Sequence, residues 1–470
     1  MTSSDRANPM NRYDPSSPML HMQEGNLSPR PMVSTQGMSL ADALAEREAS
    51  GNPVRVGLIG SGQMGTDIVV QIAQMPGIEI VAVADMNPDR VIAAVAMTEH
   101  KGLVGIATDA TEFSALRRKR YLVATCDLML VCQAEEVEVI IDATGNPDAG
   151  ARVAMQAIRA KKHIIMMNVE ADVTIGSFLA EEASRAGVVY SLGAGDEPAA
   201  AMELIRFVRA MGYPVVAAGK GKNNPFRIDA IPSDYVEEAR QRNMNPRMLV
   251  EFVDGTKTMV EMVAIANACG FVPDIPGMHG PAAPRDRLQD FFCPKEEGGL
   301  LSRKGVVDFS VAKGVAPGVF AIAEMRHPRV RERMSDLHLG PGPYYSFFRP
   351  YHLTSLEVPL SAAAAVLFGE SHMRPLALPT AEVGCVAKRN LSPGETLDAI
   401  GEYAYRGFAL AKADAKAQDA LPVGLAQGAT VKEPIAQGAL LTMANVEPNP
   451  ALAIVKARQL QDDMIASLSR

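Results

Sequence analysis

The fold is decided by the stretch Val54-Arg55-Val56-Gly57-Leu58-Ile59-Gly60-Ser61-Gly62-Gln63-Met64-Gly65, where an apolar run breaks into glycines. This pattern predicts a buried strand, a tight turn and a helix from Thr66 to Met75. In such a unit the first glycine permits the turn, the second lets the backbone approach a pyrophosphate, and the third lets the helix pack on the strand. The candidate contacts to a dinucleotide are Gly60, Gly62, Gln63, Met64 and Gly65.

A second strand, Ile78 to Asp85, strengthens this interpretation, because glycine spacing alone is a weak signal. Asp85 follows Gly65 by twenty residues, where a carboxylate that binds the adenosine ribose is expected. The sequence therefore predicts an α/β fold with a doubly wound parallel sheet and a nicotinamide dinucleotide bound to it. A doubly wound domain without a nucleotide is the alternative.

Polar residues follow the later strands of this predicted sheet. Val137 to Asp142 leads into Thr144, Gly145 and Asn146, and the next two strands lead into Glu170 and Asp196. Carboxyl ends of parallel strands share one edge, so we expect Thr144, Gly145 and Asn146 near the nicotinamide and the two acids close by. The alternatives are a plain β-to-α turn at Asn146 and a helix N-cap at Glu170 or Asp172.

Basic residues mark the block that follows. Lys220 and Lys222 alternate with glycines after an apolar strand, an arrangement that suits a phosphate, a carboxylate or a developing oxyanion. Farther along, Arg349 is a candidate phosphate clamp and His352 a candidate proton-transfer group. The alternatives are a solvated loop for the lysines and a structural role for His352.

Composition changes along the chain predict its domains. Short strands separated by Pro-Gly and Gln-Gly turns predict a small β-rich module near the C-terminus. We expect a disordered segment at 1–38, a nucleotide-binding domain at 39–192, an α+β substrate domain at 193–377, the β-rich module at 378–448 and a terminal helix at 449–470, with Ser39 as the first N-cap.

The overall composition limits the partners. A net charge of −8 without a Lys/Arg stripe argues against nucleic acid, and the chain has no apolar run of membrane-spanning length. Five cysteines without CxxC spacing indicate neither a disulfide framework nor a zinc site, so we expect reduced thiols in a cytoplasm.

The glycine fingerprint, the Thr144-Gly145-Asn146-Pro147 turn and the later substrate block resemble the homoserine dehydrogenase superfamily. Residues 381–448, with Leu-Ser-Pro-Gly-Glu-Thr-Leu at 391–397, resemble a SAF domain. The combination is similar to homoserine dehydrogenase-like proteins with a C-terminal SAF domain, a group that includes 1-deoxy-D-xylulose 5-phosphate reductoisomerase-like enzymes. The resemblance implies NADPH, a homodimer and the synthesis of 2-C-methyl-D-erythritol 4-phosphate, an isoprenoid precursor.

Two residues depart from what the resemblance implies. The stretch Met167-Asn168-Val169-Glu170 lacks the lysine of the Asn-Lys pair found in homoserine dehydrogenases, which argues against homoserine as the substrate. Asp85 is suited to a free ribose 2′-hydroxyl and would repel the 2′-phosphate of NADPH, although Arg90 is a candidate for compensating charge.

The sequence thus predicts an oxidoreductase, with NADP(H) ahead of NAD(H), acting on a small phosphorylated keto-sugar or polyol. We expect Lys220 and Lys222 to stabilise negative charge on the substrate, Glu170 or Asp196 to move protons, and Arg349 to hold the phosphate. A divalent cation on the carboxylates is an open question. The alternatives are a dehydrogenase of an unphosphorylated polyol or amino-alcohol, and a non-catalytic cofactor sensor that binds carbohydrate.

Overall fold

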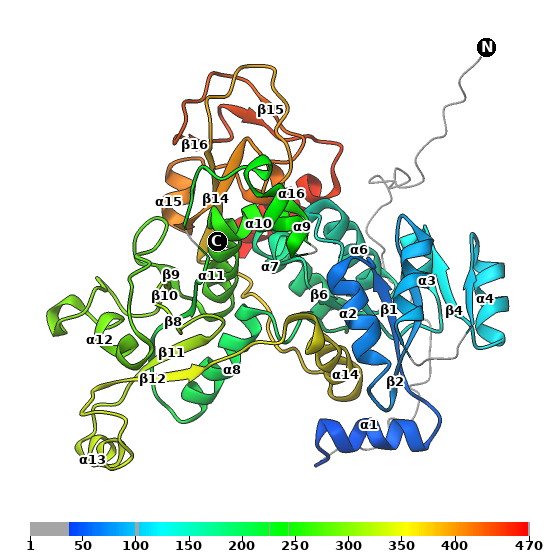
Figure 1. The fold of residues 1–470 in the computed structure, drawn as a ribbon, viewed down its shortest axis with the longest axis horizontal. Coiled ribbons are helices and arrows are strands. Elements are labelled where there is room, and N and C mark those ends of the chain that lie inside the picture. Colours follow the sequence, from blue (N-terminus) through cyan, green and yellow to red (C-terminus); the bar gives the residue numbers. More distant parts are fainter. Residues whose placement is uncertain (1–36, 99–102, 225, 243, 469–470) are drawn as a thin grey trace.

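A computed structural model describes residues 37–98, 103–224, 226–242 and 244–468 (Figure 1). The first 36 residues of the predicted disordered segment lie outside this range. Helix α1 (Leu40–Ala49) begins at the predicted N-cap, where the Ser39 hydroxyl accepts the Asp42 N–H and the Asp42 carboxylate accepts from Ser39 in return. Within the described residues, no helix is long and apolar enough to cross a membrane.

A seven-stranded parallel sheet forms the first half of the molecule, in the order β3-β4-β2-β1-β5-β6-β7. The predicted doubly wound α/β class is confirmed. Its strands are β1 (Val54–Ile59), β2 (Ile78–Ala84), β3 (Val104–Ile106), β4 (Leu122–Thr125), β5 (Val139–Asp142), β6 (His163–Met166) and β7 (Tyr190–Leu192). Its helices are α2 (Gln63–Ile72), α3 (Pro88–Ala96), α4 (Ala110–Arg118), α5 (Leu128–Gln133), α6 (Pro147–Arg159) and α7 (Val169–Ala186).

One face of this sheet is covered by a helix from much later in the chain. Helix α14 (Val358–Phe368) contacts β5, β6 and α2, and Val358, Ala362 and Ala363 are buried in the same core as Leu58 and Ile165. Figure 1 shows α14 beside α2 although it follows the second sheet in sequence. The chain therefore leaves the first sheet, builds a second one and returns.

The second sheet has five strands in the order β12-β11-β8-β10-β9. Strands β8, β10 and β9 run parallel to one another, whereas β11 runs antiparallel to both of its neighbours, β8 and β12. Helices α8 and α11 pack against it. The strands are β8 (Val215–Gly221), β9 (Val272–Pro273), β10 (Val306–Ser310), β11 (Val319–Glu324) and β12 (Tyr344–Arg349). The helices of this part are α8 (Glu197–Ala210), α9 (Val236–Gln241), α10 (Pro246–Val253), α11 (Thr256–Cys269), α12 (Leu288–Phe291) and α13 (Pro328–Asp336).

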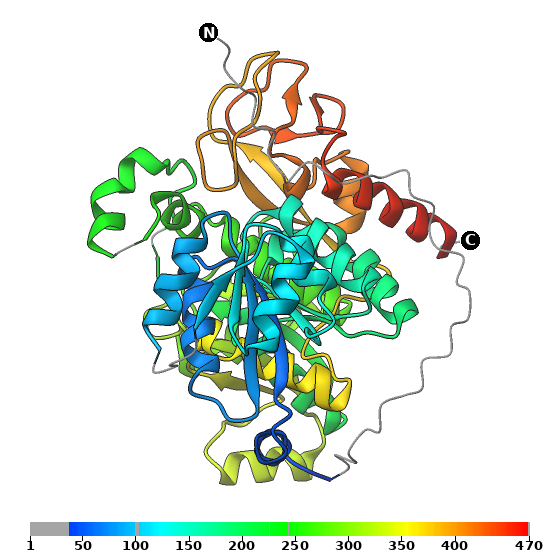
Figure 2. The same ribbon diagram turned by 90° about the vertical axis from the view of Figure 1, so that its right-hand side faces the viewer.

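The C-terminal module, residues 381–468, lies at the top of Figure 1 and Figure 2. It contains a three-stranded sheet, β14-β13-β16, a two-stranded sheet of β15 and β17, and two helices. The elements are β13 (Ala381–Ala387), β14 (Tyr405–Ala411), α15 (Lys412–Ala417), β15 (Thr430–Val431), β16 (Leu440–Leu441), β17 (Val446–Glu447) and α16 (Ala453–Leu468). Helix α16 packs on α6 and α7, and β13 and β14 pack on α11, so one continuous core joins the module to both sheets.

Candidate active site

The glycine turn after β1 has the geometry that close approach requires. Gly60 has φ +97°, and a Cβ there would lie 2.7 Å from the Ala143 carbonyl oxygen. A Cβ on Gly65 would lie 2.0 Å from the Gly60 oxygen, so only glycine lets α2 approach the turn. A Cβ on Gly62, by contrast, would meet no protein atom within 4 Å. The turn is tight on its inner side and open at Gly62, which fits a pyrophosphate at the N-terminus of α2, beside Gln63 and Met64.

Asp85, directly after β2, braces this turn. Its Oδ2 accepts the Ser61 N–H at 2.7 Å and the Ser61 hydroxyl at 2.9 Å, and its Oδ1 accepts the Asn87 N–H at 2.9 Å. The carboxylate therefore lies beside the glycine turn, and its contact with a ribose stays a prediction. Arg90 is exposed in the first turn of α3.

The end of β5 is tied to the start of α7. Asn168, the buried N-cap of α7, donates from Nδ2 to the Asn146 carbonyl at 2.7 Å and to Thr144 Oγ1 at 3.4 Å. The Asn146 side chain accepts the Ala149 N–H and so caps α6, while its Nδ2 donates to Gln427 Oε1 at 3.2 Å. The structure thus gives Asn146 the role of a β-to-α turn residue, beside Gly145, which has φ +62°.

A buried group of charged side chains, which we call the charged cluster, lies where the N-termini of three helices meet the end of one strand. Asp196 is the N-cap of α8, Glu197 its first residue, and Glu170 and Lys257 lie in the first turns of α7 and α11. Lys220 comes from the end of β8. The members of the charged cluster are Glu170, Asp196, Glu197, Lys220, Lys257, Glu261 and His352.

Lys220 stands between two carboxylates of the charged cluster. Its ammonium donates to Glu197 Oε1 at 2.6 Å and to Glu261 Oε2. Burial alone would raise the pKa of Glu197, but Lys220 and His352 hold it below its ordinary value. Burial and the neighbouring Glu197 raise the pKa of Glu261 to about 8. The pKa values of two carboxyl groups on one lysine are thus shifted in opposite directions, an arrangement that can separate acid and base roles in one site.

The remaining members extend the charged cluster toward Asn168. Lys257 Nζ lies 3.6 Å from Glu170 Oε1 and 4.0 Å from Glu261 Oε1. Burial raises the pKa of Asp196 to about 6, against the opposing effect of Lys257. Glu170 follows Asn168 by two residues. The charged cluster therefore lies next to the edge of the first sheet at which the nicotinamide is predicted.

His352 joins the charged cluster from the segment before α14. Its Nδ1 lies 3.0 Å from the Gly195 carbonyl oxygen, so Nδ1 carries the proton that it donates there. Its Nε2 lies 3.4 Å from Glu197 Oε1. A proton between His352 Nε2 and Glu197 Oε1 would give both atoms a hydrogen-bond partner. His352 therefore lies where it could transfer a proton.

Two of the predicted positively charged groups lie differently from expectation. The Arg349 guanidinium donates to Glu357 Oε1 at 2.7 Å and to Glu203 Oε2 at 3.0 Å, so it is paired with two carboxylates, and its role as a phosphate clamp stays a prediction. Lys222 is buried and donates to the Phe252 carbonyl, with no carboxylate within ion-pair distance among the described residues. Burial and the nearby Lys220 lower the pKa of Lys222 to about 8. Lys222 thus differs from Arg349 in having no carboxylate partner among the described residues.

Neither Glu170 nor Asp172 is the N-cap of α7, because Asn168 has that position. The buried Asp172 instead accepts the Tyr190 hydroxyl at 2.7 Å, and burial raises its pKa to about 7. The three members that sequence reasoning missed are Glu197, Lys257 and Glu261. Glu197 carried a signal, because it follows Asp196 at a predicted strand end.

The carboxylates of Asp196, Glu197 and Glu261 have oxygens within 4.8 Å of one another, a spacing compatible with a metal ion. Glu261 Oε1 is buried without a hydrogen-bond partner. Because Lys220 already contacts two of these carboxylates, a cation there would share them with the ammonium.

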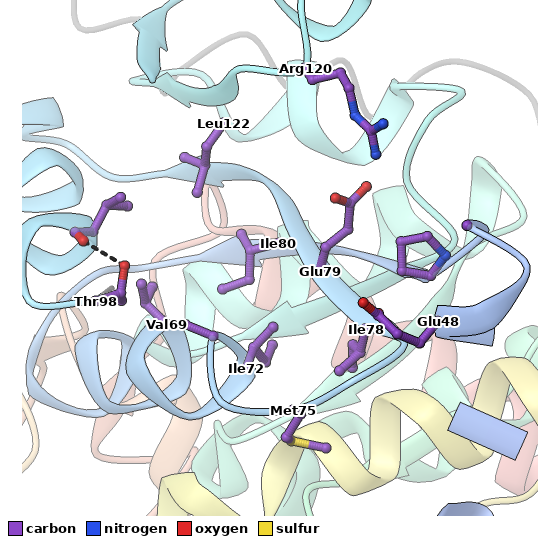
Figure 3. A pocket seen from close by; sticks show the side chains of 14 residues that line it. Glu48, Val69, Ile72, Met75, Ile78, Glu79, Ile80, Thr98, Arg120 and Leu122 are labelled. Atoms are coloured by element: carbon purple, nitrogen blue, oxygen red, sulfur yellow. Dashed lines mark hydrogen bonds between the residues drawn. The ribbon is translucent and has the colours of Figure 1, made fainter. Parts of the chain in front are cut away.

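A cavity of about 280 Å³ lies at the opposite, amino-terminal end of β2 (Figure 3). Its walls include Val69, Ile72, Ile80 and Leu122, with Glu79 and Arg120 at one side. It is far from the glycine turn in the sheet, since it borders the first residues of β2 and β4 rather than the last. A second cavity, of about 270 Å³, lies between the start of α6 and the C-terminal module and is bordered by Asn146 and Gln427.

Two family models match the chain. Residues 60–192 match the homoserine dehydrogenase NAD-binding domain, and residues 195–358 match the catalytic domain of oxidoreductase DRL. The second match contains all members of the charged cluster except Glu170. No curated protein matches the chain.

Several solved dehydrogenase structures are similar in part. One from Thermotoga maritima has 13% identity and a TM-score of 0.38, with 67% of this chain and 90% of that chain covered. Scyllo-inositol dehydrogenase from Lactobacillus casei, solved with NAD(H) and scyllo-inositol, has 13% identity, coverage of 58% and 73%, and a TM-score of 0.32. The WlbA dehydrogenase from Bordetella pertussis, solved with NADH and UDP-GlcNAcA, has 17% identity, coverage of 43% and 54%, and a TM-score of 0.28.

These TM-scores are too low to support an argument, and the assignment comes from the family models and the site. The glycine turn lies at the start of the segment that matches an NAD-binding domain, and every member of the charged cluster except Glu170 lies within the segment that matches an oxidoreductase catalytic domain. This chain is an NAD(P)-dependent oxidoreductase, with one segment similar to the homoserine dehydrogenase NAD-binding domain and another similar to the catalytic domain of oxidoreductase DRL.

Proposed function

We propose that the protein uses NADPH to reduce a small phosphorylated keto-sugar, with 1-deoxy-D-xylulose 5-phosphate as the first candidate and a reductoisomerase reaction that yields a branched polyol phosphate. The observation that carries the proposal is the charged cluster, in which Lys220 lies between Glu197, whose pKa is lowered, and Glu261, whose pKa is raised. Such a set supplies a fixed positive charge, a proton donor and a proton acceptor side by side.

The residues divide the reaction between them. Asp196, with a pKa of about 6, accepts the hydroxyl proton that starts the skeletal rearrangement. Lys220 stabilises negative charge on the substrate oxygen as the bond migrates and an aldehyde forms. Asp196 then returns its proton to the former ketone oxygen. A nicotinamide held at the glycine turn would supply the hydride that reduces the aldehyde carbon. Glu261, whose pKa burial and Glu197 raise, supplies the proton to the aldehyde oxygen, and the product is an alcohol.

Lys222 takes over the phosphate contact that the sequence assigned to Arg349. It is a buried ammonium without a carboxylate partner among the described residues, and its Nζ lies 5.8 Å from the centre of the half-exposed Phe226 ring. An anion at Lys222 would recover the charge interaction that burial has removed from it. This supports a substrate with a phosphate or carboxylate at one end.

NADPH, rather than NADH, is the proposed reductant because the Asp85 carboxylate already accepts three hydrogen bonds from the turn and from Asn87. The exposed Arg90 is available for a 2′-phosphate at the N-terminal turn of α3, where the helix dipole also favours an anion. In the competing interpretation, the Asp85 carboxylate binds the ribose 2′-hydroxyl of NADH. Measured affinities for NADPH and NADH distinguish the two interpretations.

A divalent cation and a homodimer complete the proposal. Mg²⁺ or Mn²⁺ would be held by Asp196, Glu197 and Glu261, and calorimetric titration of the protein with each ion tests this. For the dimer, β12 is the outer strand of the second sheet, and Phe207, 53% exposed, packs edge-on against Phe347 of that strand. Sedimentation velocity, with Phe207→Ser as the variant that should weaken association, tests pairing there.

A dehydrogenase of an unphosphorylated polyol or amino-alcohol is the second candidate. The observation in its favour is Arg349, whose guanidinium is held by Glu203 and Glu357 and so is not free for a phosphate.

The test is a cofactor-oxidation screen with matched phosphorylated and unphosphorylated substrates. We expect NADPH to be consumed with 1-deoxy-D-xylulose 5-phosphate and the product to have a rearranged carbon skeleton by NMR. Equal rates with and without phosphate, or a simple polyol product, would favour the second candidate. Lys220→Met is the control variant and should abolish the rate, which excludes a contaminating enzyme. No consumption of either cofactor with any member of the panel would refute the proposal.

A further inference from the structure

Lys388, directly after β13 of the C-terminal module, is a buried cation far from the charged cluster in sequence. Its side chain is 1% exposed, and its ammonium forms an ion pair with Asp254 Oδ2 at 2.6 Å. It also donates to the carbonyls of Ala230 at 2.9 Å and Glu402 at 3.0 Å. Two carbonyl oxygens therefore accept hydrogen bonds from the ammonium, and Asp254 balances its charge. Buried ion pairs add little net stability, so a pair of this kind is better explained by what it holds in place.

Asp254 fixes the start of α11. Its Oδ1 accepts the Thr256 N–H at 2.8 Å, just before the helix, and Gly255 between them has φ +89°. From β14 of the same module, the Gly407 N–H donates to Thr256 Oγ1 at 2.8 Å. Lys257 is the next residue, and Glu261 follows one turn later. Two contacts from the C-terminal module, Lys388 to Asp254 and Gly407 to Thr256, thus fix the start of α11. This helix carries Lys257 and Glu261 of the charged cluster.

The same stretch also positions Lys222. The carbonyl that accepts from the Lys222 ammonium belongs to Phe252, two residues before Asp254. A shift of Asp254 would therefore move the anchors of Lys222, Lys257 and Glu261 together.

The C-terminal module holds α7 as well. From α16, Arg458 and Gln461 donate to the Thr174 carbonyl at 3.2 Å and 2.9 Å, and Gln461 Oε1 accepts the Phe178 N–H at 3.0 Å. Glu170 lies one turn before Thr174, whose hydroxyl donates to the Glu170 carbonyl at 2.7 Å. The module is thus bonded to both helices that present the Glu170–Lys257 ion pair.

We propose that the C-terminal module is a positioning element of the active site and that Lys388 is its positioning residue, acting through Asp254 on the first turn of α11. In this role the module sets the distance between the α7 and α11 groups of the charged cluster, although Lys388 touches neither substrate nor cofactor. The inference rests on the proposed function insofar as the charged cluster carries the catalysis.

The test compares Lys388→Met with the double variant Asp254→Asn/Lys388→Met. Methionine leaves a buried carboxylate without its cation, whereas asparagine keeps an oxygen for the Thr256 N–H and needs no cation. We expect Lys388→Met to lower kcat by roughly 10- to 100-fold, with the Kd for NADPH unchanged because the glycine turn is untouched. The double variant should recover most of the lost kcat. Arg389→Met, which removes a neighbouring cation of the module that is paired with the surface residue Glu395, is the matched control and should retain the wild-type kcat.

Hydrogen exchange provides a readout that needs no substrate. The amides of residues 256–261 should exchange faster in Lys388→Met and return toward wild-type rates in the double variant, while those of α6 stay unchanged. If the wild type turns over no substrate, the proposed function fails and the exchange data still decide the role of Lys388. Wild-type kcat and exchange in Lys388→Met would overturn the inference, as would a folded double variant that recovers neither. Should Lys388→Met alone not fold, a folded and active double variant supports the inference and an inactive one overturns it.

Discussion

Lys220→Met should destabilise the protein in a pH-dependent way. The ammonium contacts Glu197 Oε1 at 2.6 Å and also Glu261, and the Lys220 side chain is 8% exposed. Removal of one partner of a buried ion pair costs about 3–5 kcal/mol of unfolding free energy, because the other charge stays buried. We expect that loss at pH 7, with the fold retained because methionine keeps most of the volume of the stem.

The loss should shrink as the pH falls. In the wild type, the lowered pKa of Glu197 contributes stability that is present above its unfolded-state pKa and lost as the pH falls through the folded-state value. In the variant, the buried Glu197 has a raised pKa, which destabilises the folded state as the pH rises. Protonation of Glu197 at lower pH relieves this cost. At about 1.4 kcal/mol per pH unit, the difference between the two proteins should narrow by up to about 2.7 kcal/mol between pH 7 and pH 5.

Urea unfolding of both proteins at pH 5, 6 and 7 measures this difference. Lys222→Met is the matched control on the same strand end, because Lys222 has no carboxylate within ion-pair distance among the described residues. The pKa of Lys222, lowered to about 8, means that this lysine is charged in both states across the range, so its effect should not vary with pH. A Lys220→Met difference that stays constant from pH 7 to pH 5 would refute the reasoning.

Three further outcomes are expected. Gly62→Val should abolish binding of both NADPH and NADH in calorimetry while the unfolding free energy changes by no more than about 0.5 kcal/mol, because Gly62 has φ −67° and open space at its Cβ; unchanged affinity would misplace the cofactor. Asp85→Ser should weaken NADH more than NADPH, since only NADH offers a 2′-hydroxyl donor to the carboxylate, and equal losses would show that Asp85 does not contact the ribose. Lys222→Met should lower kcat/KM by roughly 10- to 150-fold from loss of a charge-assisted hydrogen bond, with KM raised if Lys222 only grips the substrate anion and kcat lowered if it acts in the transition state, whereas full activity would exclude it from the site.

Local patterns made the nucleotide-binding half predictable. The strand at Val54, the glycine turn and the strand before Asp85 are contiguous, and each depends on spacing within about thirty residues. Even there the start of α7 differs from the alternative of an N-cap at Glu170 or Asp172. The N-cap is Asn168, whose buried side chain accepts the Ala171 N–H.

The charged cluster was less predictable because its partners come from distant segments. Lys257 and Glu261 lie in α11, where a lysine and a glutamate at that spacing are also typical of an exposed helix face. The partners of Arg349 were unpredictable for the same reason, since Glu203, one of the two, is 146 residues away. Sequence spacing carries no information about such a pairing, and only the packing of α8 beside β12 creates it.

The return of the chain to α14 makes the second sheet an insertion within the first domain, not a domain added after it. A fragment ending at residue 192 would lack Val358, Ala362 and Ala363 and would expose the apolar face of β5 and β6 that they cover. We therefore expect such a fragment to aggregate. A deletion variant that links residue 192 directly to α14, without residues 193–357, should be more soluble. For the same reason, a chimera with a related protein would have to replace residues 193–357 as one segment and preserve both junctions.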